Sequence, residues 1–406
     1  MSGDVPADRA AELRAHHRRM PVARHRSLAL HWLAGWARPP RPAHGEPLPT
    51  IAPGQLGVTF GGHATALVRY ADLDIAFDPM LGRWLGGIRR AQEPGLAPGD
   101  LDRVGLVLIS HRHRDHLHLP TLALLPRSAT IVVPPGGAHA LSHLGFARVL
   151  ELAVGGDLEF RGVQVTAAPM SHGEAAKARG LSYVVRGPGP SVYLCGDGAY
   201  FSGFASIGER FAPDVALLPI GGFAPASFRD RHMSPLDALY AFEDLRARLM
   251  VPIHHGAFAL SYERLGEPAR WLAQLVRERG LEAHVRILPV GGSEVLVPPR
   301  DVREPDETVA VAVAPVGPAA APVALIEPAA PVALVDAPSA SVEVAVEPTG
   351  PIAAPDAPLG ALLDRLAAGI PEPSLGDAGD GVPAMFDSPD TREPTGPRDP
   401  IDALFH

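Results

Sequence analysis

Short apolar runs recur along residues 51–300, separated by polar, Gly and Pro residues. Those within 58–77 alternate with polar positions and predict antiparallel strands. The run at 106–109, which Ser110 follows, is continuously apolar and too short for a helix, so it predicts a strand covered on both faces. Helix and strand patterns then take turns, with late strands expected at 285–288 and 294–297. This order predicts two sheets packed face to face with helices outside, an α+β fold.

The two ends of the chain differ from this middle part. Residues 301–406 carry 18 of the 45 prolines, and 18 acidic residues against 4 basic ones. Their repeated Ala-Pro-Val units bury too little apolar surface to fold. We therefore expect an N-terminal helical extension with a Pro-rich linker (1–50), one domain (51–300) and a disordered acidic Pro/Ala-rich tail (301–406) with an unknown partner.

Charge and cysteine content exclude several classes of protein. Residues 51–300 hold 24 basic and 23 acidic residues, which is too balanced for a nucleic-acid-binding surface, so we expect no nucleic-acid partner. Cys195 is the only cysteine, which excludes an internal disulfide. The N-terminus lacks a secretory-signal pattern, and no run reaches 18 apolar residues. We expect a cytoplasmic protein.

Residues 23–37 form a helical pattern before the prolines at 39–42. Trp32 and Trp36 repeat at a spacing of four on its apolar face, and arginines stand at both ends. One interpretation is a helix packed on its own domain. The other is peripheral contact with the inner face of the membrane, because aromatic and basic residues around an apolar face suit a lipid surface.

The chemistry follows the buried strand directly, where residues 111–116 read His-Arg-His-Arg-Asp-His. His111 and His113 are two apart, so both imidazoles point the same way from an extended segment. The adjacent Asp115 and His116 diverge and suit a second metal ion. Solvated loop histidines are the alternative, but three histidines and an aspartate within six residues favour two metal ions side by side.

This pattern resembles the signature of the metallo-β-lactamase superfamily, and three later segments (169–172, 193–197 and 252–256) resemble its remaining ligand segments. The resemblance implies an αββα sandwich with two metal ions. It assigns one ion to His111, His113 and His172, the other to Asp115, His116 and His254, and a bridging role to Asp197. It selects His254 over its neighbour His255. Two Zn²⁺ ions suit such ligands, and iron or manganese would accept them too.

Within the superfamily, residues 55–298 resemble the branch that contains N-acylphosphatidylethanolamine-hydrolysing phospholipase D. The matching segments are 62–65 (Gly-His-Ala-Thr), 78–79 (Asp-Pro), 219–225 and 232–235. Gly198 departs from this branch, which has a threonine there, and His255 stands where the branch has a tryptophan.

The resemblance implies a hydrolase in which a metal-bridging hydroxide attacks a phosphodiester, such as an N-acyl phospholipid. The substrate would be a small molecule or a lipid. Catalytic roles fall to Asp115, through its metal ion, and to His232, which would stabilise or protonate the developing negative charge. His232 has an alternative interpretation as a neighbour of a helix N-cap. Two other functions stay open, a lactonase or other ester hydrolase of the same fold and a non-catalytic metal-binding scaffold.

The composition of the tail generates the first prediction. Deleting residues 305–406 leaves thermal stability and hydrolysis unchanged, because that segment buries too little apolar surface to contribute to a core. Thermal unfolding and activity of the truncated and full chains measure this. A large drop in melting temperature on truncation would contradict it.

Overall fold

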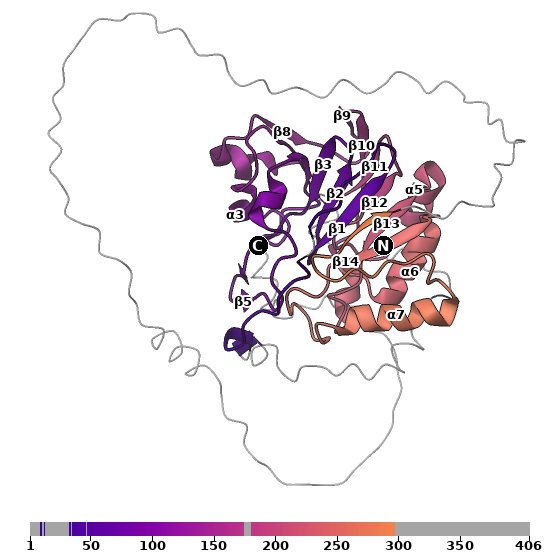
Figure 1. Cartoon of the computed structure of the whole chain (residues 1–406). Helices are drawn as coiled ribbons and strands as arrows, with labels where there is room; N and C mark the ends of the chain where they lie inside the picture. Colours follow the sequence, from indigo (N-terminus) through magenta and orange to yellow (C-terminus); the bar gives the residue numbers. More distant parts are fainter. Residues whose placement is uncertain are drawn as a thin grey trace, which may run out of the picture. The chain divides into compact units, whose positions relative to one another are not determined.

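The computed structural model describes residues 9, 12, 32, 33, 35–45, 47–173 and 180–296. Two sheets and a small hairpin account for its strands (Figure 1). The predicted tail at 301–406 lies outside the described residues, as does most of the N-terminal extension. In the described part of the chain, no helix is both long and apolar enough to cross a membrane.

A seven-stranded sheet has the strand order β15-β1-β2-β3-β6-β7-β8. Strands β1 to β3 form an antiparallel meander, while β3, β6, β7 and β8 run parallel. Its strands are β1 (Leu56–Gly62), β2 (Thr65–Tyr70), β3 (Leu73–Phe77), β6 (Val104–Leu108), β7 (Thr130–Val133), β8 (Arg148–Glu151) and β15 (Ser293–Leu296).

A six-stranded sheet has the order β14-β13-β12-β11-β10-β9, antiparallel from β9 to β12 and parallel from β12 to β14. Its strands are β9 (Asp157–Phe160), β10 (Val163–Pro169), β11 (Leu181–Arg186), β12 (Val192–Leu194), β13 (Val215–Pro219) and β14 (Leu249–Ile253). The remaining strands, β4 (Trp84–Leu85) and β5 (Ile88–Arg89), pair as a hairpin inside a stretch expected to be a loop.

Apolar side chains fill three layers of packing. The space between the sheets holds one cluster with residues from both, among them Leu106, Leu108 and Val165. Val107 and Ile109 of the β6 segment point the other way, into a second cluster under the outer helices. The continuous apolar run at 106–109 therefore reflects burial on both faces, as predicted.

Helices cover both outer faces (Figure 1). On the six-stranded sheet lie α5 (Gly203–Phe211), α6 (Pro235–Asp244) and α7 (Glu267–Arg279), and on the other lie η1 (Pro98–Leu101), α3 (Leu119–Leu122) and η2 (Ala138–Leu144); η3 (Ala226–Asp230) precedes α6. The arrangement is the predicted αββα sandwich, which is confirmed.

The prediction of a strand at 285–288 is wrong. Val285 makes a single parallel bridge to Met250, at the edge of β14, and the pairing stops there. Pro289 follows directly and has no N–H to donate to a ladder, which limits further pairing along this edge.

Two described residues of the N-terminal extension are helical and contact the outer helices. Arg9 pairs with Asp244 at 2.8 Å, and Glu12 pairs with Arg279 at 2.7 Å. Apart from these two, residues 1–31 lie outside the described residues. These ion pairs attach the extension to α6 and α7.

Candidate metal centre

The predicted metal ligands lie where strands end at one edge of the sandwich. Four of them follow β6, in the loop that begins at Ser110. One follows β10, one follows β12 and one follows β14. Loops beyond the carboxyl ends of parallel strands are where open α/β sheets hold their sites. The residues so placed are His111, His113, Asp115, His116, His172, Asp197 and His254.

The first group consists of His111, His113, His172 and Asp197, whose ligand atoms all lie within 4.8 Å of one another. His111 Nε2 is 2.8 Å from His113 Nδ1, and His172 Nε2 is 3.3 Å from the same atom. Asp197 Oδ1 lies 3.7 Å from His111 Nε2. Three imidazoles and one carboxylate form a ligand set typical of a transition-metal ion.

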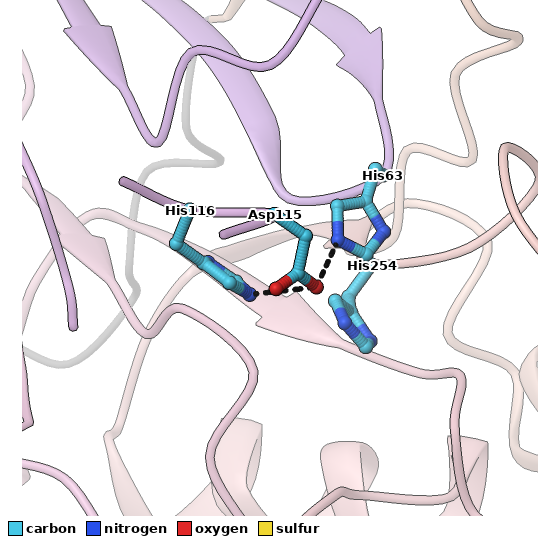
Figure 2. A group of neighbouring side chains, drawn as sticks. All are labelled: His63, Asp115, His116 and His254. Carbon is cyan, nitrogen blue, oxygen red and sulfur yellow. Dashed lines mark hydrogen bonds and ion pairs between the residues drawn. The ribbon is translucent and has the colours of Figure 1, made fainter. Parts of the chain in front are cut away.

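The second group consists of Asp115, His116, His254 and one residue not foreseen as a ligand, His63. Figure 2 shows the Asp115 carboxylate between the rings of His116 and His63. The other oxygen of Asp197, Oδ2, is 3.3 Å from His116 Nε2 and 3.8 Å from His254 Nε2. Asp197 therefore faces both groups, one through each carboxylate oxygen.

Neighbouring oxygens orient the imidazoles. Asp78 accepts hydrogen bonds from the Ser110 backbone N–H at 2.7 Å and hydroxyl at 2.6 Å, and it lies 2.7 Å from His116 Nδ1. His254 Nδ1 faces the Gly221 carbonyl at 3.2 Å. A carboxylate or carbonyl on one ring nitrogen directs the other toward the centre, which is the usual arrangement behind metal-bound histidine.

Several buried atoms in the described part of the chain find no hydrogen-bond partner, and they converge here: His116 Nε2, His254 Nε2, Asp115 Oδ1 and Asp197 Oδ1. Leaving such atoms unpaired in a dry interior costs about 1–3 kcal/mol each. Metal ions would satisfy all four, so the residues present fit two ions.

Electrostatics favour the charge states that metal binding needs. Burial lowers the pKa of His111 and His254 well below its ordinary value, and it lowers that of His172 to about 4, so these rings stay neutral ligands. Although burial opposes its ionisation, His172 and neighbouring imidazoles hold the pKa of Asp197 well below its ordinary value. The carboxylate is therefore charged at neutral pH.

His116 differs from the other rings. Burial lowers its pKa, but Asp197, Asp115 and Asp78 outweigh burial and raise the pKa well above the ordinary value. Three carboxylates around one imidazole make this the position in the centre that most strongly attracts a cation, either a proton or a metal ion.

His232 lies at the rim of the centre. Its Nε2 is 3.5 Å from Asp197 Oδ2, and its side chain is 19% exposed while the surrounding ligands are buried. The ring stacks on His254 with centroids 5.4 Å apart. His232 therefore reaches both solvent and the bridging carboxylate, although it also precedes the capping residue of α6, Ser234.

The adjacent histidines of β14 point in different directions. His254 joins the second group, whereas His255 belongs to no such group in the described part of the chain and stacks on Phe60 with ring centroids 4.8 Å apart. Burial lowers the pKa of His255 to about 4. Its neutral ring packs as a wall residue.

His63 and Asp78 are the functional residues that the sequence analysis missed. Both appeared only as parts of motifs, in segments 62–65 and 78–79. Each has a positive φ, +58° for His63 and +40° for Asp78, so neither backbone follows a strand or helix pattern. The available signal was that each is a polar residue directly after a buried strand. Hydrophobic periodicity assigns no role to such a residue.

Comparison with known proteins supports a single family. Residues 74–255 match the beta-lactamase superfamily domain. The chain is 31% identical over 244 residues to a UPF0173 metal-dependent hydrolase of Methanopyrus kandleri, covering 58% of this chain and 98% of that protein. It is 33% identical over 202 residues to a UPF0173 metal-dependent hydrolase of Thermofilum pendens, covering 48% and 82%.

A solved structure described as a possible metal-dependent hydrolase from Veillonella parvula shares the fold, with a TM-score of 0.52 and 21% identity over 60% of this chain and 100% of that one. The two-sheet sandwich and its histidine-rich edge thus define a metal-dependent hydrolase of the metallo-β-lactamase superfamily. Within that superfamily, the chain belongs to the UPF0173 metal-dependent hydrolase family.

The directions of the adjacent histidines generate the second prediction. His254→Ala loses about one metal ion per chain and nearly all hydrolysis, because it removes a ligand. His255→Ala is the matched control: it keeps both ions and changes mainly substrate affinity. Elemental analysis with steady-state kinetics measures both variants. If His255→Ala removed the metal instead, the register of β14 would be wrong.

Proposed function

We propose that this chain is a dinuclear hydrolase with one ion in each group and Asp197 between them. The observation that carries the proposal is the shared carboxylate, whose two oxygens face different sets of imidazoles. Nitrogen and oxygen donors without a thiolate suit Zn²⁺, and iron or manganese is the alternative.

The residues then divide the work. The two groups of ligands would hold the ions, which would supply hydroxide by lowering the pKa of a water toward neutrality. Asp197 and Asp115 hold negative charge at fixed positions, and His232 is placed to donate a proton to a leaving oxygen from the solvent side. This role requires no movement of the buried ligands, because His232 combines partial exposure with contact to Asp197.

For the substrate, we propose a phosphodiester such as an N-acyl phospholipid. Its support is the set of motifs similar to the phospholipase D branch, including the His232 segment and segment 62–65. A lactone or other ester is the second candidate, because the same hydroxide chemistry serves it. A non-catalytic metal-binding scaffold is the third candidate, and we place it last because an idle fold has no physical need to keep seven metal-binding side chains together.

The third prediction tests the metal centre. Purified protein expressed in metal-supplemented medium contains close to two transition-metal ions per chain, and Asp197→Asn loses most of both because the shared ligand is neutralised. Asp102→Asn, which removes an exposed carboxylate at the opposite end of β6 from the ligands, is the control. Fewer than one ion in the unmodified protein would refute the dinuclear centre.

The same preparations identify the reaction. Bis(p-nitrophenyl) phosphate, N-acyl phosphatidylethanolamine in vesicles and a generic lactone are offered in parallel. Turnover of the phosphodiesters supports the phosphodiesterase, turnover of the lactone alone selects the lactonase, and two bound ions without any turnover select the scaffold.

We also propose that the surface formed by Leu33, Trp36 and Trp84 contacts a lipid membrane. These side chains are 52%, 42% and 47% exposed, and the two indoles meet edge to face with centroids 6.1 Å apart. Arg38 and Arg83 are exposed beside them. Trp36 also donates its indole N–H to the Gly87 carbonyl at 2.8 Å, so it contacts the domain while its ring stays exposed. Trp32 donates its indole N–H to the Ala259 carbonyl at 2.9 Å and is half-buried on the domain. Both interpretations of this helix thus find support, at different residues.

The fourth prediction concerns this tryptophan surface. Replacing Trp36 and Trp84 together by Ser weakens binding to vesicles containing anionic lipid by about tenfold or more, because two indoles leave the interface. Val154→Ser is the control, since Val154 is 57% exposed elsewhere in the chain. Cosedimentation measures the binding, and equal partitioning of all three proteins would leave only the packed helix.

A further inference from the structure

His63 occupies a strained position between the two sheets. It follows β1 at the turn into β2 with φ +58°, and His254 at the end of β14 has φ +56°. The two residues meet through their backbones: the His254 N–H donates to the His63 carbonyl at 2.6 Å, and the His63 N–H donates to the His255 carbonyl at 3.4 Å. Positive φ is unfavourable for residues other than glycine, so surrounding contacts must hold it.

The side chain of His63 contacts another ligand of the same group. Its Nε2 lies 2.8 Å from Asp115 Oδ2, and both side chains are 3% exposed (Figure 2). Because Asp115 is ionised, the imidazole donates this hydrogen bond. A charged acceptor makes it stronger than a neutral pair, and it fixes the rotation of the carboxylate.

A buried aromatic and a buried cation hold the His63 ring in place. Phe258 meets it edge to face at 5.6 Å, and the Arg90 guanidinium lies 4.8 Å from the Phe258 ring centre. Arg90 is 1% exposed and is fixed by the carbonyls of Met80 and Gly82. The ring therefore has little freedom to leave Asp115.

We infer that His63 is the positioning residue of the second metal site, setting Asp115 through its side chain and His254 through its backbone. The inference rests on the proposed dinuclear centre. His116 Nε2, His254 Nε2 and Asp115 Oδ1 are buried without a hydrogen-bond partner, and Asp197 Oδ2 lies 3.3 Å and 3.8 Å from the two nitrogens. These four residues can supply the four protein ligands that Zn²⁺ usually takes, whereas His63 Nε2 is already paired with Asp115. His63 therefore acts on a ligand and is not itself one. The first site, which it does not contact, is independent of it.

Two amide variants test this role. His63→Gln carries its amide N–H near the position of Nε2 and can still reach Asp115, whereas the amide of His63→Asn is one carbon shorter. Asparagine also tolerates positive φ better than histidine does, so backbone strain cannot explain a loss in that variant. The metal-free proteins are titrated with Co²⁺, followed by absorption and calorimetry, and the melting temperature of each metal-free form is recorded.

We expect His63→Asn to bind the first equivalent of Co²⁺ normally and the second about 10–100-fold more weakly. His63→Gln restores the second equivalent to within a few-fold of the unmodified protein. Tight second binding in His63→Asn, equal weakening of both equivalents, or failure of Gln to rescue would overturn the positioning role; the last would make His63 a ligand. Failure of the dinuclear centre itself is seen separately, as a single equivalent in the unmodified protein.

Discussion

The centre depends on the cost of holding carboxylates away from water. Asp78, Asp115 and Asp197 are each at most 2% exposed, and removing one ion from water costs several kcal/mol even in a relaxed protein. The surrounding histidines offset this cost by donating hydrogen bonds, and His116, whose pKa the carboxylates raise, can also carry positive charge. Their spacing, their tautomers and the loops that carry them all follow from that requirement.

The sandwich meets the requirement by bringing strand ends together. Parallel pairing of β6 with β3, and of β13 with both β12 and β14, aligns the ends of these strands at one edge. The loop after β6 then contributes four ligands, and the segments after β10, β12 and β14 contribute one each. The apolar cluster between the sheets fixes their separation, so ligands far apart in the sequence meet within 4.8 Å.

The fold and much of the centre were accessible from the sequence because their signals are local. The apolar run at 106–109 indicates burial on both faces directly, and the spacing of the histidines and the aspartate from His111 to His116 indicates metal binding. The resemblance supplied His172, Asp197 and His254, and the structure brings all of these residues together. The strand at 285–288 failed because sheet-edge pairing depends on neighbours that local pattern does not reveal.

His63 and the hairpin of β4 and β5 escaped for a related reason. A single histidine with positive φ and strands of two residues produce no periodic pattern in the sequence. Their contacts also join segments that lie apart in the chain. Trp32 and Trp36 show the same limit, since residues four apart on one helical face end in different surroundings: one donates to Ala259 and the other lies exposed.

The division of ligands between the sheets has a consequence for assembly. His111, His113, Asp115 and His116 follow a strand of the seven-stranded sheet, while His172, Asp197 and His254 follow strands of the six-stranded one. Neither half of the sandwich alone supplies all the ligands of either group. Metal binding therefore requires the two sheets to pack together. Without metal ions, the Asp115 carboxylate after the seven-stranded sheet and the Asp197 carboxylate after the six-stranded sheet would repel each other. Metal binding would therefore come late in folding, after both halves of the sandwich have formed.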